Sequence, residues 1–352
     1  MEALDQQRWR DTINVARLGQ WMDERGLGSG PLEEEALLTG GTQNILLRFR
    51  RGSRYYILRR PPRHLRKNSN DTMRREARVL AALAASDVPH PRLIAACDND
   101  EVLGVAFYLM EPVTGFNATT GMPALHADSS DIRYQMGLSL VDSIAALGRV
   151  DHIAKGLSDF GKVEGYLERQ VGRWRHQLQS YREFPEWPGE RDLQGTEEIS
   201  AWLTANVPSE FVPGIIHGDY HFANVLFRYD APRIAAIVDW ELSTIGDPLL
   251  DLGWLLATWH DPIHDRRPAN VQPWAGLPTP AELVGRYGDQ VDRDISAICW
   301  FAVLACFKLG IILEGTFARA CAGRAPVETG ERLHGSAVDL FKRAQRFMSM
   351  GL

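Results

Sequence analysis

The stretch "IIHGDYHFANVLF", residues 215 to 227, places a carboxylate and an amide in an otherwise apolar segment. The carboxylate is Asp219, and the amide, Asn224, is followed at once by the strand-like "VLF". A second apolar segment, "AAIVDWE", brings Asp239 twenty residues after Asp219. Because short strands that end in polar residues can present them around a common point, we expect these three side chains to form one site.

The chemistry that suits this set of residues is phosphoryl transfer. A carboxylate can orient or deprotonate an acceptor hydroxyl, and hard oxygen ligands hold Mg²⁺ on the phosphates of a nucleotide. A single Asp or Asn is more often only the cap of a turn. The ordered set of Asp219, Asn224 and Asp239 therefore carries more weight than any one of its members.

The pattern of the sequence changes near residue 113. Before that point a short amphipathic helix is expected near residues 13 to 22 and a second helix over residues 71 to 85. Strands are expected on both sides of the turns "RGS" and "DND", at residues 45 to 49, 55 to 60, 92 to 97 and 102 to 110. Later segments are mostly helical in pattern. The chain is therefore expected to be an α+β protein with a small sheet-bearing lobe, residues 1 to 113, and a larger helical lobe, residues 114 to 352.

A glycine pair and an acidic residue stand out in the small lobe. Gly40 and Gly41, in "LLTGGTQNILLRF", lie between two expected strands, where they permit close approach of the backbone to phosphates. On the helix "MRREARVLAAL", Glu76 lies in an apolar stripe. A carboxylate in such a place needs a cation, and Arg59 in the strand "YYILRR" is its natural partner.

The ordered motif His217-Gly218-Asp219, Asn224 and Asp239 resembles the signature of the aminoglycoside phosphotransferase and choline kinase group, relatives of the protein kinases. The resemblance implies a protein-kinase-like fold of two lobes, with Asp219 as the catalytic base or hydroxyl-orienting group. It also implies that Asn224 and Asp239 hold Mg²⁺ and that His217 braces the loop through hydrogen bonds.

Three further polar residues near the motif have roles that the sequence leaves open. His221 could reach either the substrate or the backbone of the loop. Asp247 and Asp251, in "STIGDPLLDLGWLL", are more consistent with capping a helix and supporting the catalytic loop than with substrate contact. Asp before an apolar helical run is a signal for the start of a helix.

The same resemblance implies that ATP binds between the two lobes, and the sequence does not exclude GTP. Arg59 stands where the family has a phosphate-binding Lys, and Arg is not a neutral replacement for Lys. Arg59 and Glu76 are counted with Asp219 and His217 as catalytic residues. Arg59 is also expected to bind the nucleotide. The other residues expected to contact it are Gly40, Gly41 and Thr42 in the phosphate loop, the backbone of Glu111 and Val113 at the hinge, and the apolar side chains of Ile57, Leu226 and Val238.

The motifs around Arg59 point to one branch of this group. Arg59 is followed by "RPP", and with "GGTQN" and "DPLLDLG" these segments most closely resemble the phosphotransferase branch related to the amino-terminal domains of certain acyl-CoA dehydrogenases. Members of that branch are associated with phosphorylation of hydroxyacyl-CoA substrates. We therefore expect an ATP- and Mg²⁺-dependent phosphotransferase acting on a hydroxyl of a small molecule, such as a hydroxyacyl-CoA or a related anionic metabolite.

Two other functions remain open at this point. An aminoglycoside kinase is disfavoured because residues 260 to 352, expected on the acceptor side, contain eleven basic and ten acidic residues and thus no acidic excess for a polycation. A nucleotide-binding pseudokinase is favoured only by Arg59. An anionic acceptor draws support from twelve Arg and Lys against two acidic residues over residues 48 to 78, although such runs are commonly solvated faces.

Composition limits the remaining choices. The 352 residues carry a net charge of −6 and show no RNA or DNA module, so no nucleic-acid partner is expected. The first twenty residues lack a signal-peptide pattern, and the four Cys lack metal-site or disulfide spacing, which fits a reducing cytoplasm. Residues 295 to 313 are nearly apolar but contain Lys308, and we expect a buried core helix there rather than a membrane span. A homodimer is neither indicated nor excluded.

Overall fold

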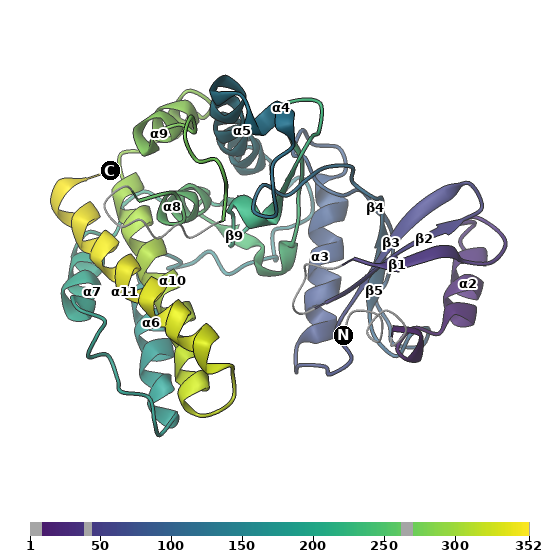
Figure 1. Ribbon diagram of the computed structural model, residues 1–352, viewed down its shortest axis with the longest axis horizontal. Helices are drawn as coiled ribbons and strands as arrows, with labels where there is room; N and C mark the ends of the chain where they lie inside the picture. The colour runs from purple at the N-terminus through teal and green to yellow at the C-terminus, as the bar shows by residue number, and fades with distance from the viewer. Residues whose placement is uncertain (1–8, 39–43, 262–269, 352) are drawn as a thin grey trace.

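The computed structural model describes residues 9 to 38, 44 to 261 and 270 to 351. It confirms the α+β class and the protein-kinase-like arrangement. Figure 1 shows a small lobe, which contains the larger sheet and α3, beside a larger and mainly helical lobe. Three residues expected to contact the nucleotide, Gly40, Gly41 and Thr42, lie outside the described residues.

The small lobe is built on one antiparallel sheet of five strands in the order β1-β2-β3-β5-β4. Its elements are η1 (Trp9–Asp11), α2 (Val15–Asp23), β1 (Glu33–Leu37), β2 (Ile45–Arg51), β3 (Arg54–Arg60), α3 (Ser69–Leu83), β4 (Leu93–Cys97) and β5 (Phe107–Met110). Successive strand residues point to opposite faces of a sheet. Accordingly Phe107 and Leu109 pack with α2 on one face, whereas Tyr108 packs with α3 on the other.

The strand expected over residues 102 to 110 is wrong in its first half, because β5 begins only at Phe107. Gly104 has a φ of +72°, in the left-handed region, so the chain turns there instead of extending. Leu103 and Val105 are nevertheless buried against the α2 face of the sheet. Their apolar pattern therefore reflects burial in a turn rather than in a strand.

The large lobe consists mainly of helices and contains two short antiparallel ribbons. Its helices are α4 (Ala124–Ala127), α5 (Ser130–Gly148), α6 (Glu168–Ser180), α7 (Thr196–Ala205), α8 (Leu249–Ala257), α9 (Pro280–Gly288), α10 (Ile298–Cys321) and α11 (Val327–Met350), with short 3₁₀ turns η2 (Tyr181–Glu183), η3 (Phe222–Asn224) and η4 (Trp240–Leu242). The ribbons pair β6 (Gly214–Ile216) with β9 (Thr244–Gly246), and β7 (Val225–Phe227) with β8 (Ile234–Ile237).

Helix α10 contains the apolar stretch that was expected in the core. It packs against α6, α7, α8 and α11. Among the described residues it is the one helix long and apolar enough to cross a membrane, and 72% of its most apolar window is buried inside the protein. A core helix passes the same test of length and composition, and this degree of burial agrees with a core helix.

The two lobes are joined by the segment that follows β5. The backbone of Phe116 pairs with that of Phe227 in both directions at 2.8 Å. A Cβ on Gly115 would lie 2.8 Å from the carbonyl oxygen of Phe227, so glycine permits this close approach. On α3, Arg75 donates a hydrogen bond to the carbonyl of Ser243 at 3.1 Å. These contacts hold the segment after β5, and helix α3 of the small lobe, close to the ribbons of the large lobe.

Candidate active site

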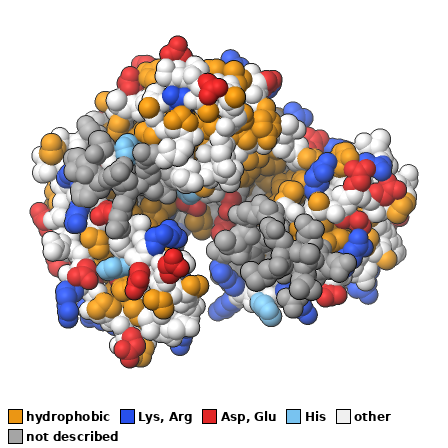
Figure 2. Space-filling view, viewed as in Figure 1, with side chains coloured by type: hydrophobic (Ala, Val, Ile, Leu, Met, Phe, Trp, Pro, Cys, Tyr) orange, Lys and Arg blue, Asp and Glu red, His pale blue; other side chains and the backbone are white. Residues whose placement is uncertain are grey.

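The residues of the HGD motif form a loop between β6 and η3, at the junction of the lobes. Asp251 on α8 accepts hydrogen bonds from the backbone N–H groups of His217 and Gly218, at 2.7 and 2.9 Å. Gly218 has a φ of +85°, and a Cβ there would lie 2.5 Å from the carbonyl oxygen of Leu242, so no larger residue fits. Figure 2 shows that the surface is hollowed between the two lobes.

His217 connects this loop to the second acidic segment. Its ring is fully buried. Nε2 donates to the carbonyl of Val238 at 2.9 Å, and Nδ1 accepts the N–H of Asp219 at 3.3 Å. His217 therefore fixes the distance between the loop that carries Asp219 and the end of the ribbon that carries Asp239. A direct catalytic role for His217 stays a prediction.

Asp219 is held by three side-chain hydrogen bonds. Its Oδ1 accepts from Nε1 of Trp254 at 2.9 Å and lies 3.2 Å from Nε2 of His221, while its Oδ2 accepts from Nδ2 of Asn224 at 3.0 Å. The Nδ1 of His221 accepts the N–H of Ala223 at 3.2 Å, so in the neutral ring the proton is on Nε2 and is donated to Asp219.

These contacts decide the charge of Asp219. Burial acts to raise the pKa of the carboxyl, but the hydrogen bond from His221, the electrostatic effect of the two histidines His221 and His217, and the hydrogen bond from Asn224 outweigh burial and hold the pKa at about 2. The group is therefore ionised at neutral pH. Its side chain is still 31% exposed, so an acceptor hydroxyl can reach it.

Asn224 and Asp239 are brought together by the β7–β8 ribbon. Val238 donates its N–H to the carbonyl of Asn224 at 2.9 Å, which places Asp239 next to the end of the loop. Asp239 has a φ of +66°, unusual for a residue with a side chain, and its carboxylate is 41% exposed. Asn224 uses its Nδ2 toward Asp219, which leaves its Oδ1 as an acceptor.

This donor set fits Mg²⁺. The described part of the chain contains no cluster of three or more His, Cys, Asp or Glu that could hold a metal ion on its own. Mg²⁺ does not need such a cluster, because it is commonly bound by one or two carboxylates together with water and the phosphates of a substrate. Asp239 and Asn224 would provide the protein oxygens of such a site.

Arg59 links the two lobes across the site. Its guanidinium is almost fully buried, with Nε 2.8 Å from Oε2 of Glu76 and Nη2 2.7 Å from Oδ1 of Asp239. Tyr108 donates to the same Glu76 carboxylate at 2.8 Å. Burial acts to lower the pKa of Arg59, but the surrounding acidic groups, Glu76 first, raise it above the ordinary value. Arg59 therefore remains a cation between a carboxylate of each lobe.

The remaining residues predicted around the nucleotide lie near the junction of the lobes. Ile57 pairs with Met110 in the sheet, directly before the hinge. The N–H of Glu111 donates to Arg92 at 2.9 Å, which leaves the carbonyl of Glu111, rather than its N–H, to face a base. In the large lobe, Leu226 lies on β7 and Val238 directly follows β8. Contact of these residues and of Val113 with adenine stays a prediction.

The two acidic residues that follow the motif support the site in different ways. Asp247 lies just before α8, whose N-cap residue is Pro248; its Oδ1 accepts the N–H of Leu249 at 3.0 Å, and it pairs with Arg293 at 2.7 Å. Asp251 lies within α8 and holds the catalytic loop instead of capping the helix. Of the two roles expected for this pair, helix start and support of the catalytic loop, the contacts of Asp247 agree with the first and those of Asp251 with the second.

Among the residues that sequence reasoning missed are two that hydrogen-bond to this loop from α8 and from the segment after β5. Trp254 fixes Asp219, and Asn117 donates to the carbonyl of Ala223 at 2.7 Å. The signal for Trp254 was present in its spacing. It lies three residues after Asp251 on one helix, and residues at that spacing share a face. An indole in an apolar helix nevertheless resembles ordinary core packing.

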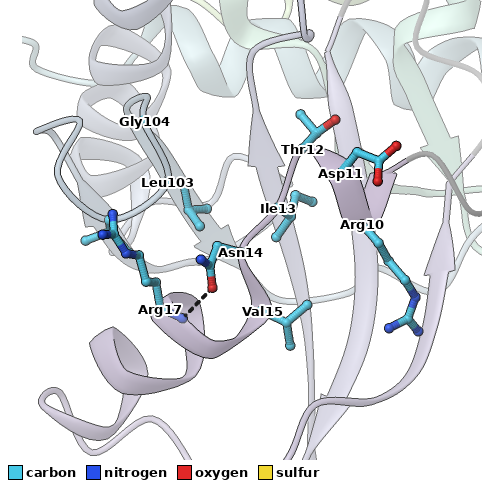
Figure 3. A pocket seen from close by; sticks show the side chains of 10 residues that line it. Arg10, Asp11, Thr12, Ile13, Asn14, Val15, Arg17, Leu103 and Gly104 are labelled. Atoms are coloured by element: carbon cyan, nitrogen blue, oxygen red, sulfur yellow. Dashed lines mark hydrogen bonds between the residues drawn. The ribbon is translucent and has the colours of Figure 1, made fainter.

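A separate pocket lies in the small lobe (Figure 3). Its volume is about 510 Å³, and it is formed by η1, the start of α2 and residues 102 to 104. Within it, the backbone N–H of Arg17 donates to the side chain of Asn14 at 3.0 Å and thereby caps α2. None of the residues predicted for the nucleotide or the acceptor lines this pocket.

Comparison with known proteins identifies the family. Residues 36 to 283 match the model of the phosphotransferase enzyme family known as APH. Acyl-CoA dehydrogenase family member 11 of Rattus norvegicus is 30% identical over 339 residues, which cover 92% of this chain and 41% of that protein. The human protein of the same name is 30% identical over 337 residues, with the same coverage. The chain thus spans about two fifths of the length of these curated relatives.

Solved structures agree with the sequence match. A crystal structure from Ralstonia eutropha JMP134, provisionally named an aminoglycoside phosphotransferase, has a TM-score of 0.78 and 29% identity over 95% of this chain and 98% of its own. Aminoglycoside phosphotransferase APH(4)-Ia, solved with AMP-PNP and hygromycin B, has a TM-score of 0.60 and 14% identity over 93% and 98%. At 14% identity, the similarity to APH(4)-Ia shows a shared fold and nothing more. Because the family model covers more than half of the chain, this protein belongs to the phosphotransferase enzyme family.

Proposed function

We propose that this protein transfers the γ-phosphoryl group of ATP, with the help of Mg²⁺, to a hydroxyl of a small molecule. The observation that carries the proposal is the ionised and partly exposed carboxylate of Asp219, fixed by Trp254, His221 and Asn224 beside Asp239. A pseudokinase would have no need to keep this arrangement. GTP is the second candidate for the phosphoryl donor, since one structural neighbour was solved with GDP.

Each residue has a definite task in this proposal. The carboxylate of Asp219 accepts a hydrogen bond from the acceptor hydroxyl. It takes up the proton as the hydroxyl oxygen bonds to the γ-phosphorus and the bond from that phosphorus to ADP breaks. Trp254 and His221 keep the carboxylate in position. Mg²⁺ would neutralise charge on the phosphates, and Asn224 and Asp239 would hold it.

For the acceptor we propose an anionic metabolite, such as a hydroxyacyl-CoA. The relatives named acyl-CoA dehydrogenase family member 11 favour this class over aminoglycosides. The basic run over residues 48 to 78 supports it less than the sequence indicated. Much of that run forms ion pairs within the chain, of whose arginines only Arg51 is buried: Arg50 pairs with Glu33 and Glu34, Arg51 with Asp23, Arg54 with Glu111, Arg74 with Asp71 and Arg78 with Asp159.

A nucleotide-consumption screen tests the proposal. Hydroxyacyl-CoAs, aminoglycosides, choline-like alcohols and sugars are offered with Mg·ATP, and the same panel is run with Asp219→Asn. We expect consumption with at least one anionic acceptor that the variant does not support. Phosphorylation of aminoglycosides together with no activity on any hydroxyacyl-CoA would replace the proposed acceptor. Failure of the wild type to bind either Mg·ATP or Mg·GTP would reject the kinase assignment.

Asp239→Ala should weaken the binding of Mg·ATP by at least about tenfold, because loss of even an outer contact of a metal ligand commonly costs 10–100-fold in affinity. Turnover should fall with it. Calorimetry with ATP in the presence of Mg²⁺, and again with a chelator, measures the effect. The chelated titration is the control, since Mg²⁺-free ATP should not lose affinity. Equal binding of Mg·ATP by wild type and variant would show that Asp239 is not a ligand.

A further inference from the structure

Lys308 on α10 lies beside the catalytic loop, although nothing in the proposed reaction uses it. Its Nζ lies 3.4 Å from the carbonyl oxygen of Gly218 and 4.4 Å from the ring centroid of Trp254. A second indole, that of Trp174 on α6, lies 5.5 Å from the same Nζ. Trp254 also donates to Asp219, so the cation and the proposed base contact the same side chain.

This ammonium group lacks a counter-charge in direct contact. Among the described residues, no carboxylate lies within 4 Å of its Nζ. The nearby carboxylates of Asp219 and Asp251 are engaged elsewhere, the first with Trp254, His221 and Asn224, and the second with the loop backbone. An ammonium has three donors, and only one long hydrogen bond to Gly218 uses them.

Lys308 keeps its positive charge although it is partly buried. Burial lowers its pKa to about 8, against the pull of Asp219 and Asp251. The amine is therefore mostly protonated at pH 7. A second cation lies close by, because the exposed guanidinium of Arg173 lies 5.3 Å from the ring centroid of Trp174. Both cations are arranged around indoles, whose faces attract positive charge, and not around acidic side chains.

We propose that Lys308 binds an anionic group of the acceptor, a carboxylate or a phosphate, while the acceptor hydroxyl contacts Asp219. This inference rests on the proposed function and assigns the specificity of its acceptor site. A half-buried cation with unused donors gains most from an anion that brings its own negative charge. The same ammonium group would repel a polycationic acceptor. The site would therefore favour anionic acceptors and disfavour cationic ones.

Chemical labelling tests the anion site without any need for turnover. An amine-reactive reagent is applied to the protein with Mg·ADP bound, and the labelled lysines are quantified by peptide mass spectrometry. Butyrate and inorganic phosphate are the anionic probes, butyramide is the neutral probe, and the exposed Lys342 on α11 is the control. We expect at least one of the two anions, but not butyramide, to slow the labelling of Lys308 at least fivefold. The labelling rate of Lys342 should not change. Equal labelling of Lys308 with and without both anions would overturn the inference.

The two anions also identify the group that is bound. Protection by butyrate alone assigns a carboxylate, and protection by phosphate alone assigns a phosphate. Either result supports an anion site at Lys308.

A kinetic comparison separates this inference from the proposed function. Lys308→Met keeps the length of the side chain and removes its charge, and Lys342→Met is the matched control. With an anionic acceptor found by the screen, we expect the KM for that acceptor to rise at least tenfold in Lys308→Met, with Mg·ATP affinity unchanged. The uncharged amide of the same acceptor should show no such difference between variants.

The outcomes are distinct. An unchanged acceptor KM in Lys308→Met, with an active wild type, overturns the role of Lys308 and leaves the kinase assignment intact. A wild type that binds neither Mg·ATP nor Mg·GTP overturns the kinase assignment, and the labelling result then still decides whether Lys308 binds anions.

Discussion

Asp219→Asn should lower the rate of phosphoryl transfer by about 10²–10⁴-fold, the range commonly lost with a general base. The substituted amide has nearly the same shape and can still accept a hydrogen bond from Trp254, whose Nε1 lies 2.9 Å from Oδ1. It cannot take up the proton of the acceptor hydroxyl. Mg·ATP affinity should change little, because the proposed metal ligands are Asn224 and Asp239. Single-turnover kinetics and calorimetry measure the two quantities separately.

The matched control is Asp230→Asn. Asp230 lies in the exposed turn between β7 and β8 and pairs with Arg228 at 2.8 Å. The control loses one carboxylate from the same part of the chain, so it should retain wild-type turnover. Turnover by Asp219→Asn at the wild-type rate would remove Asp219 from the reaction. A joint loss of turnover and Mg·ATP binding would instead indicate that Asp219 organises the metal site.

The family and the fold class could be predicted because the informative residues lie close together in sequence. His217, Asp219 and Asn224 belong to one loop of eight residues, and Asp239 follows the next ribbon. A short loop between two strands leaves few arrangements for these side chains. The pairing of Arg59 with Glu76 followed from a similar constraint, because a carboxylate on an apolar helix face needs a cation nearby.

The contacts that the sequence did not reveal join elements that are far apart in the chain. Lys308 reaches Gly218 from a helix ninety residues later, and Arg59 reaches Asp239 across the lobes. No local periodicity encodes such pairs, because they depend on how helices α6, α8 and α10 pack. The charge pattern over residues 48 to 78 has the same limit. Counting charges cannot show that Arg51 and Arg54 are already paired with Asp23 and Glu111.

Arg59→Ala should cost about 3–5 kcal/mol of the free energy of unfolding, the usual loss when one partner of a buried ion pair is removed. Glu76 has no exposed surface, and without Arg59 the hydroxyl of Tyr108 would be the one hydrogen-bond donor to its carboxylate among the described residues. ATP affinity should fall as well, because Arg59 is the cation proposed to bind the phosphates. Urea unfolding and calorimetry measure the two effects. Wild-type stability and affinity in the variant would contradict both roles.

The dependence of this loss on pH is a sharper test. Burial raises the pKa of Glu76 from 4.5 to about 7 even though Arg59 and Tyr108 oppose the change. A carboxyl with a raised pKa in the folded state favours folding most below its unfolded pKa, and that contribution is lost as pH rises through the folded value. Removal of the cation should raise the folded pKa further. The difference in stability between wild type and Arg59→Ala should therefore widen as pH rises above about 7, and a constant difference would show that Glu76 is not the group left unpaired.

Arg59→Lys separates the charge of this residue from its shape. Nη2 of the guanidinium donates to both Glu76 and Asp239, at 3.2 and 2.7 Å, and Nε lies 2.8 Å from the Glu76 carboxylate. An ammonium is instead a single point of charge. We expect Lys to keep the pair with Glu76, and with it most of the stability, but to lose the contact with Asp239 and lower the rate of transfer. Wild-type turnover in Arg59→Lys would show that the charge alone is sufficient. A large loss of turnover with preserved stability would show that the two-sided contact of arginine has become part of how this site binds phosphate.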